Sequence, residues 1–172
     1  MNTQSGKTEA PLPIRLRPTT SNDLDFVLAA EQDPNNRPFI LPWPRDRHVA
    51  ALNDPDLVHQ MLVHDSLGPV GFVILAGLGD PHGNLEFRRI VVTWKRRGFG
   101  RAAVQLVKRF AFVQRQAHRL WLDVKEQNPR ARALYESEGF VVEGVLRECL
   151  KGDGGFESLI LMSMLASEYK EA

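Results

Sequence analysis

A short basic segment with two glycines has the residue types and spacing to bind an anion. It reads Lys95-Arg96-Arg97-Gly98-Phe99-Gly100-Arg101 and lies between an apolar stretch and a helix-forming sequence. The first amides of a helix have no partner within the helix, and the helix dipole places partial positive charge on them. Glycine residues allow an anionic group to come close to these amides. The segment is therefore predicted to hold phosphate oxygens at a helix N-terminus.

The helix that carries these amides is predicted over residues 98–116. Its apolar residues recur at helical spacing, whereas its basic residues lie off that stripe. The apolar set is Ala103, Leu106, Val107, Phe110 and Val113. The stretch Arg89–Val92 before the glycines has the composition of a strand. A strand, a basic loop and a helix therefore follow one another in the predicted anion site.

Two other arrangements bind phosphate through glycine loops. Gly98, Gly100 and Ala103 fit the dinucleotide pattern GxGxxA, and Asp123 lies where a ribose-binding acid would. In a dinucleotide-binding fold, however, the strand runs almost directly into the first glycine, whereas residues 93–97 intervene here. A dinucleotide-binding domain is therefore the less favoured alternative. A P-loop is excluded at this position because the loop contains no Gly-Lys-Ser/Thr sequence.

The composition limits the class of protein. The chain has 172 residues, of which 43% are hydrophobic and 25% charged, as in a single soluble globular domain. Its net charge of +1 indicates no broad nucleic-acid-binding surface. The single cysteine, Cys149, excludes an internal disulfide framework and a CxxC metal site, and no other metal cluster is expected. Without a signal-peptide core or a membrane-spanning run, the protein is expected to be cytoplasmic, with no membrane partner.

The order of predicted elements indicates an α+β fold. Residues 1–12 are expected to form a flexible tail and residues 13–172 a single domain. Strands are predicted at 14–18, 57–64, 70–76, 85–92, 120–124, 140–148 and 156–164, with helices at about 21–33, 46–52, 98–116 and 129–138. The proline-rich stretch 35–44 is expected to be irregular. The strand, helix and strand over 85–124 predict a right-handed parallel crossover in a mixed, mainly antiparallel sheet flanked by helices.

Two motifs in this order resemble the GNAT superfamily of acetyl-CoA-dependent N-acetyltransferases. Lys95–Gly100 fits the family pattern [QR]-x-x-G-x-[GA] except for lysine at its first position, and residues 128–140 reproduce N-x-x-A-x-x-L-Y-x-x-x-G-F. The chain is most similar to the branch that contains ribosomal-protein N-terminal acetyltransferases and spermidine acetyltransferases. The resemblance implies a GNAT-like fold and direct transfer of an acetyl group from acetyl-CoA to a primary amine. The alternative is an acetyl-CoA-binding regulatory domain without catalysis.

The resemblance also implies which residues contact coenzyme A. Amides from about Arg97 to Arg101 would hold the pyrophosphate. Two splayed parallel strands would leave backbone groups free to bind the pantetheine arm as an added strand. Asn128 would touch the cofactor and also cap the following helix. The expected cofactor-binding residues are Ile90, Val91, Val92, Arg97, Gly98, Phe99, Gly100, Arg101 and Asn128.

Two residues are implied to be catalytic. Tyr135 corresponds to a tyrosine that protonates the leaving thiolate in many members of the family, and packing against the sheet is its alternative role. Glu86 lies where related enzymes often carry a glutamate that acts as a base through water, and an ion pair with Arg88 is its alternative role. The other candidate bases are His59, His64 and His118.

The acceptor amine is expected to enter opposite the cofactor, between residues 35–47 and the turn 151–155. Glu31 and Asp33 would attract an ammonium group, while Phe39 and Trp43 would shield it from water. A protein N-terminus, a polyamine or other small amine, and an antibiotic with an amino group remain open as acceptors. The formation of a homodimer is open as well.

Overall fold

A computed structural model describes residues 13–171, and the tail predicted at residues 1–12 lies outside these described residues. The strands are β1 (Arg15–Pro18), β2 (Leu57–His64), β3 (Gly68–Ala76), β4 (Asn84–Val92), β5 (Arg119–Lys125), β6 (Val141–Gly152) and β7 (Gly155–Leu165). The α-helices are α1 (Leu24–Gln32), α2 (Arg45–Leu52), α3 (Phe99–Arg109) and α4 (Pro129–Ser137). The predicted order of strands and helices is thus confirmed.

The strands form one sheet in the order β1-β2-β3-β4-β5-β7-β6. Its one parallel pair is β4 with β5, and helix α3 provides the crossover between them. The other neighbours are antiparallel. The predicted α+β architecture, a mainly antiparallel sheet with a central parallel crossover, is confirmed.

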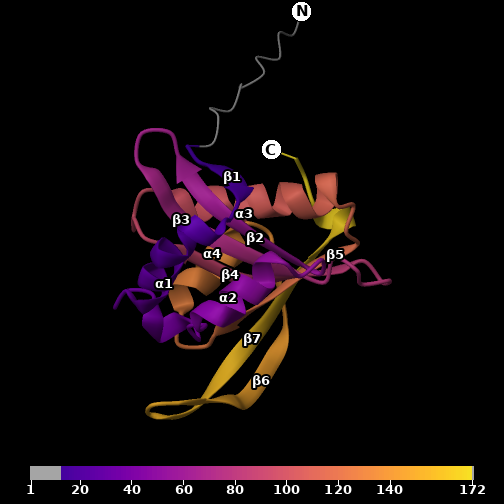
Figure 1. Ribbon diagram of the computed structural model, residues 1–172. Coiled ribbons are helices and arrows are strands. Elements are labelled where there is room, and N and C mark those ends of the chain that lie inside the picture. The colour runs from indigo at the N-terminus through magenta and orange to yellow at the C-terminus, as the bar shows by residue number, and fades with distance from the viewer. Residues whose placement is uncertain (1–12, 172) are drawn as a thin grey trace, which may run out of the picture.

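Helices cover both faces of the sheet and bury two separate apolar clusters. One cluster joins α3 and Tyr135 of α4 to one face of the sheet, as seen in the burial of Ala103 and Val107. The second cluster packs Val27 and Ala30 of α1 and Ala51 of α2 against the opposite face. Figure 1 shows this arrangement, with the β6–β7 hairpin extending away from the rest of the molecule. Strand β3 is therefore buried on both faces, which accounts for its continuous apolar sequence.

A bulge in β4 opens the centre of the sheet. Ile74 of β3 pairs with Arg89, but the next residue, Leu75, pairs with Phe87, so Arg88 is the extra residue. The parallel ladder between β4 and β5 covers only Asn84–Glu86 and Arg119–Trp121. Beyond it the two strands are not paired with each other, because a bulge bends its strand and increases the local twist. The splayed strands predicted from the family resemblance are therefore present.

Two predicted segments differ in detail from the structure. The α-helical part of residues 98–116 ends at Arg109, and residues Phe110–Gln114 continue it as a wider π-helical turn. The proline-rich stretch 35–44 contains a single 3₁₀ turn at Arg37–Phe39 and is otherwise irregular. None of the helices within residues 13–171 is both long and apolar enough to span a lipid bilayer.

Candidate active site

The opening between β4 and β5 forms a cavity of about 540 Å³. Its floor is made by the unpaired halves of the two strands, and the start of α3 and one face of α4 form its sides. Residues from the proline-rich stretch and from the β6–β7 hairpin close its far end. The lining residues used below are Phe39, Leu41, Arg88, Arg89, Ile90, Val92, Gly98, Phe99, Gly100, Arg101, Asp123, Lys125, Asn128, Leu134, Tyr135, Leu150 and Leu159.

The start of α3 presents unpartnered amides at one end of this cavity. The first helical hydrogen bond runs from the Ala102 amide to the Gly98 carbonyl at 3.0 Å, so the amides of Phe99–Arg101 precede it. Gly98 has a φ of 76° and Arg96 a φ of 60°, so the loop turns twice through the left-handed region before the helix. Such alternating conformations form a concave backbone surface that suits an anion. The predicted anion site therefore has the required geometry.

The side chains at this end tie the two motifs together. Arg101 donates to the carboxylate of Glu138, at the end of α4, and to the Ser137 hydroxyl at 3.1 Å. Lys108 donates to the same carboxylate at 2.9 Å. The Arg101 guanidinium is thus bound to Glu138, whereas the Arg101 backbone amide belongs to the unpartnered amides at the start of α3. The clamp also fixes the start of α3 relative to α4.

The charge of the cavity favours an anionic cofactor. Its described lining residues include seven basic side chains and one carboxylate, that of Asp123. Four of the basic residues are paired with carboxylates outside the lining, namely Arg88, Arg89, Arg101 and Lys125. The other three are Lys95, Arg96 and Arg130. Burial lowers the pKa of Lys95, and the nearby charge of Arg130 acts in the same direction. An added phosphate would offset the repulsion that Arg130 exerts on Lys95.

Asn128 caps α4 and also lines the cavity. Its side chain accepts a hydrogen bond from the Ala131 amide at 3.1 Å and thereby caps α4. The same residue lines the cavity. Of the other expected cofactor-binding residues, Val91 and Arg97 do not line it: Val91 packs in the second apolar cluster, and the Arg97 guanidinium lies 5.3 Å from the Trp94 ring centre.

Tyr135 lies in the middle of the cavity, on α4. Its ring packs edge-on against Phe87 and Phe140, with centre-to-centre distances of 6.3 and 5.8 Å. Burial raises the pKa of the Tyr135 phenol well above its ordinary value, and the negative charge of Asp123 adds to this. The hydroxyl therefore stays protonated at neutral pH and can donate a proton. Packing and proton donation are both compatible with this position.

The carboxylate that faces the cavity is that of Asp123, whereas Glu86 is outside its lining. Glu86 accepts hydrogen bonds from Arg88 Nη2 at 2.6 Å and Nε at 3.0 Å, which is the ion pair left open in the sequence. Loss of surrounding water raises the pKa of Asp123, and the charge of Glu86 adds to this effect. A raised pKa makes a carboxylate a better base.

The histidines proposed as alternative bases lie elsewhere. His59 is buried on the opposite side of the sheet, where it contacts Thr19 and His48. Neither His64 nor His118 is among the residues that line the cavity.

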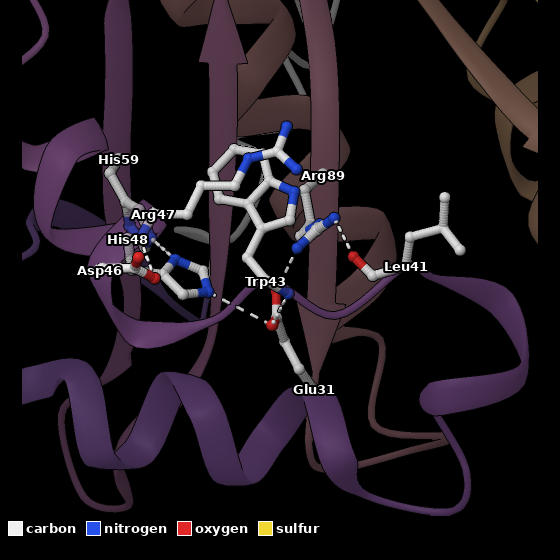
Figure 2. A network of polar contacts seen from close by, with 8 residues as sticks. All are labelled: Glu31, Leu41, Trp43, Asp46, Arg47, His48, His59 and Arg89. Atoms are coloured by element: carbon white, nitrogen blue, oxygen red, sulfur yellow. Dashed lines mark hydrogen bonds and ion pairs between the residues drawn. The ribbon is translucent and has the colours of Figure 1, made fainter.

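The four residues expected at the acceptor occupy different places. Phe39 lines the cavity and is 41% exposed. Asp33 accepts hydrogen bonds from Asn35 and does not line it. Glu31 and Trp43 are buried behind the cavity wall, in the polar network of Figure 2. Glu31 lies on the apolar stripe of α1 with Leu24 and Val27, so its carboxylate is directed into the protein and not toward an acceptor.

Several lining residues were not foreseen as site residues from the sequence. In β5, the residues Leu120, Leu122 and Val124 are buried, so alternation places Asp123 and Lys125 on the other face. That alternation was a usable signal for Asp123. By contrast, Leu150 and Leu159 reach the cavity from the β6–β7 hairpin, which the periodicity of those strands does not indicate.

Comparison with known proteins identifies the family. The Acetyltransferase (GNAT) family matches residues 22–140. Spermidine N(1)-acetyltransferase of Vibrio cholerae is 25% identical over 168 residues, which cover 91% of this chain and 95% of that protein. The Escherichia coli K12 enzyme of the same name is 25% identical over 167 residues, covering 91% of this chain and 88% of that protein.

Solved structures share the fold. The crystal structure of the Vibrio cholerae spermidine N-acetyltransferase in complex with CoA and spermine has a TM-score of 0.83 at 24% identity, covering 91% of this chain and 98% of that one. A dodecameric structure of the Vibrio cholerae enzyme has a TM-score of 0.78 at 26% identity, covering 91% and 96%. The family match includes the glycine loop, the splayed strands and Tyr135. The chain therefore belongs to the acetyltransferase (GNAT) family of acetyl-CoA-dependent N-acetyltransferases.

Proposed function

We propose that the β4–β5 cavity transfers the acetyl group of acetyl-CoA directly to a small primary amine. One observation carries this proposal: the same cavity contains the free amides at the start of α3, the phenol of Tyr135 and the carboxylate of Asp123. The amides would hold the pyrophosphate, with Gly98 and Gly100 allowing close approach. The unpaired backbone of Ile90–Val92 would receive the pantetheine arm as an added strand.

Acetyl-CoA would supply an activated thioester, and residues of the chain would accept and donate the protons. The Asp123 carboxylate would accept a proton from the entering ammonium, which frees the nitrogen lone pair to attack the carbonyl carbon. The carbon–sulfur bond then breaks, and the Tyr135 hydroxyl would donate its proton to the departing sulfur. The acylated nitrogen loses its second proton, which would pass through solvent to the Tyr135 phenolate, and Asp123 would release the proton it accepted to solvent before the next turnover. The Glu86 carboxylate would act indirectly, since its charge favours the protonated form of Asp123.

The acceptor class is a small primary amine, with polyamines such as spermidine as the first candidates. The names of the relatives support this choice. The ammonium would approach the single carboxylate of the lining, and its carbon chain would contact Phe39, Leu150 and Leu159. A peptide N-terminus is the competing acceptor, which the comparisons do not support.

An acceptor screen tests the proposal. Release of the CoA thiol would be followed with spermidine, a simple monoamine and short peptides, and the acetylated product would be identified by mass spectrometry. We expect thiol release that depends on a free primary amine. Tight binding of acetyl-CoA without transfer to any amine would instead support a regulatory domain.

We also propose that the chain forms a homo-oligomer. The edge strand β6 exposes Val141, Val145 and Leu146, and Phe156 of β7 is 66% exposed. A dodecamer is recorded for the Vibrio cholerae enzyme. Light scattering after gel filtration should give a mass above that of one chain, and replacing Phe156 by Ser should reduce it.

A further inference from the structure

A network of buried polar side chains lies behind the acceptor end of the cavity (Figure 2). Glu31 and His48 are fully buried, while His59 is 6% and Arg89 8% exposed. The carboxylate of Glu31 forms an ion pair with Arg89 through one oxygen and contacts His48 Nε2 through the other at 3.2 Å. His48 Nδ1 contacts His59 Nε2 at 3.2 Å, and His59 Nδ1 contacts the Thr19 hydroxyl at 2.8 Å. The network is therefore continuous from the end of β1 to β4.

The bulge in β4 brings Arg89 into this network. Leu85 and Phe87 pack in the cluster of α3, whereas Val91 packs in the cluster of α1. The extra residue, Arg88, changes the face of the strand at this point. Arg89 consequently points toward α1 and meets Glu31.

One arrangement of protons satisfies every member of the network if both histidines are neutral. Burial would raise the pKa of Glu31, but the hydrogen bond from His48 and the charge of Arg89 outweigh it and lower that pKa. The ionised carboxylate can only accept, so His48 Nε2 must donate to it. His48 Nδ1 then accepts from His59 Nε2, and His59 Nδ1 accepts from the Thr19 hydroxyl. In this arrangement the network contains one ion pair, Glu31 with Arg89.

This pair also holds the wall of the cavity. The Glu31 carboxylate accepts a hydrogen bond from the Trp43 amide at 2.9 Å, and Arg89 Nη2 donates to the Leu41 carbonyl at 2.6 Å. The two contacts lie on either side of Pro42, which has no amide of its own. The Trp43 ring packs under the Arg89 guanidinium, with 4.6 Å between that group and the ring centre. Leu41 itself lines the cavity and is 52% exposed.

We propose that the Glu31–Arg89 pair is a positioning element for the acceptor: it fixes the segment 41–43 from behind so that Phe39 and Leu41 form a rigid wall for the amine. The inference rests on the proposed function of the cavity. Glu31 does not touch the acceptor and acts through the backbone of Leu41 and Trp43. Because the segment is already fixed at two backbone groups, binding of the amine does not have to order it, and this lowers the entropic cost of binding.

A wall that depends on a buried ion pair differs from one held by apolar packing alone. Two buried charges are desolvated at a cost that their attraction only partly offsets, so such a pair is weak evidence for added stability. Its hydrogen bonds, however, have fixed directions. Removing both charges should therefore increase the mobility of segment 41–43, while the free energy of unfolding of the domain changes little.

The test compares charge-neutral variants in steady-state kinetics and hydrogen exchange. Glu31→Gln combined with Arg89→Met removes both charges together, because either single change could leave an unpaired charge that prevents folding. In the folded double variant, the KM for the amine should rise roughly tenfold or more, and by a larger factor than the KM for acetyl-CoA. Exchange of the Trp43 amide should accelerate as well. Arg89→Lys, whose single nitrogen can serve only one of Glu31 and Leu41, should give an intermediate amine KM.

The control is a second carboxylate–arginine pair, Glu143 of β6 with Arg119 of β5, whose atoms lie 2.7 Å apart and which is not part of the cavity lining. Glu143→Gln combined with Arg119→Met should change neither KM. A folded Glu31/Arg89 double variant with an unchanged amine KM, or with an unchanged exchange rate at Trp43, overturns the inference. If the wild-type protein acetylates no amine, the proposed function fails, and the exchange at Trp43 alone decides whether the pair holds the segment.

Discussion

The two ends of the cavity are built in different ways. The end proposed for the cofactor is formed by two short segments, the start of α3 with its preceding loop and the start of α4. The end proposed for the acceptor consists of side chains from the proline-rich stretch, β5 and the β6–β7 hairpin, which are far apart in the sequence. A shared cofactor can be held by a fixed backbone arrangement, whereas the acceptor surface can change without altering that arrangement. The comparison teaches that the reaction and its specificity have separate structural supports.

The largest effect is expected where the two ends meet, at Tyr135. Tyr135→Phe keeps the ring that packs on Phe87 and Phe140 but removes the proton donor. We expect kcat to fall by roughly 10²–10⁴, with little change in acetyl-CoA affinity. Single-turnover kinetics and calorimetry would measure the two quantities. A kcat equal to that of the wild type would restrict Tyr135 to packing.

The next effect distinguishes the two candidate bases. Asp123→Asn keeps the shape of the side chain but cannot accept a proton, so kcat should fall by roughly 10²-fold or more. In the variant, the plot of kcat/KM against pH should also lack the increase that results from deprotonation of Asp123 in the wild type.

Glu86→Gln serves as the comparison for Asp123. Because Glu86 is paired with Arg88 and outside the cavity lining, we expect a loss of less than about tenfold. A larger loss for Glu86→Gln than for Asp123→Asn would support the base first predicted from the sequence. The pH profiles of both variants should be recorded under the same conditions.

A smaller effect concerns stability at the acceptor end. Burial lowers the pKa of His59 to about 4. Between pH 4 and its ordinary value near 6.5, the unfolded chain binds a proton that the folded protein does not. Stability from this group is therefore complete above pH 6.5 and falls as the pH is lowered to 4, by at most about 3 kcal/mol. Urea unfolding of wild type and His59→Gln should show a weaker pH dependence in the variant, and equal slopes would contradict the expectation.

The same difference between the ends explains what the sequence could predict. Gly98, Gly100, Asn128 and Tyr135 belong to two short motifs, and the family resemblance implied that these residues share one site. All four line the cavity. The bulge at Arg88 was not predictable from alternation, because Leu85 and Phe87 continue the pattern into Arg89. Its effect is to reverse the face on which Arg89 lies.

For one residue expected at the acceptor, Glu31, the helical periodicity of the sequence already predicts a buried position. Glu31 follows Leu24 and Val27 at helical spacing, so its burial could have been predicted from α1 alone. Its partner could not, since Glu31 and Arg89 are 58 residues apart and no local rule joins them. Trp43 was expected to face the amine, yet its amide donates to Glu31 and its ring packs against Arg89. An acidic residue on an apolar stripe therefore indicates a buried partner before it indicates a ligand.

Calorimetric titration of acetyl-CoA into Gly100 variants tests the central claim most directly. A β-carbon at Gly100 would lie 3.5 Å from Leu134 Cδ2, an ordinary contact, so Gly100→Ala should fold normally. The larger Gly100→Val should fold too, but its branched side chain would cover the amides at the start of α3. We predict a loss of acetyl-CoA affinity of roughly tenfold or more for Gly100→Val, and a smaller loss for Gly100→Ala. Wild-type affinity in a folded Gly100→Val variant would contradict the placement of acetyl-CoA in this cavity.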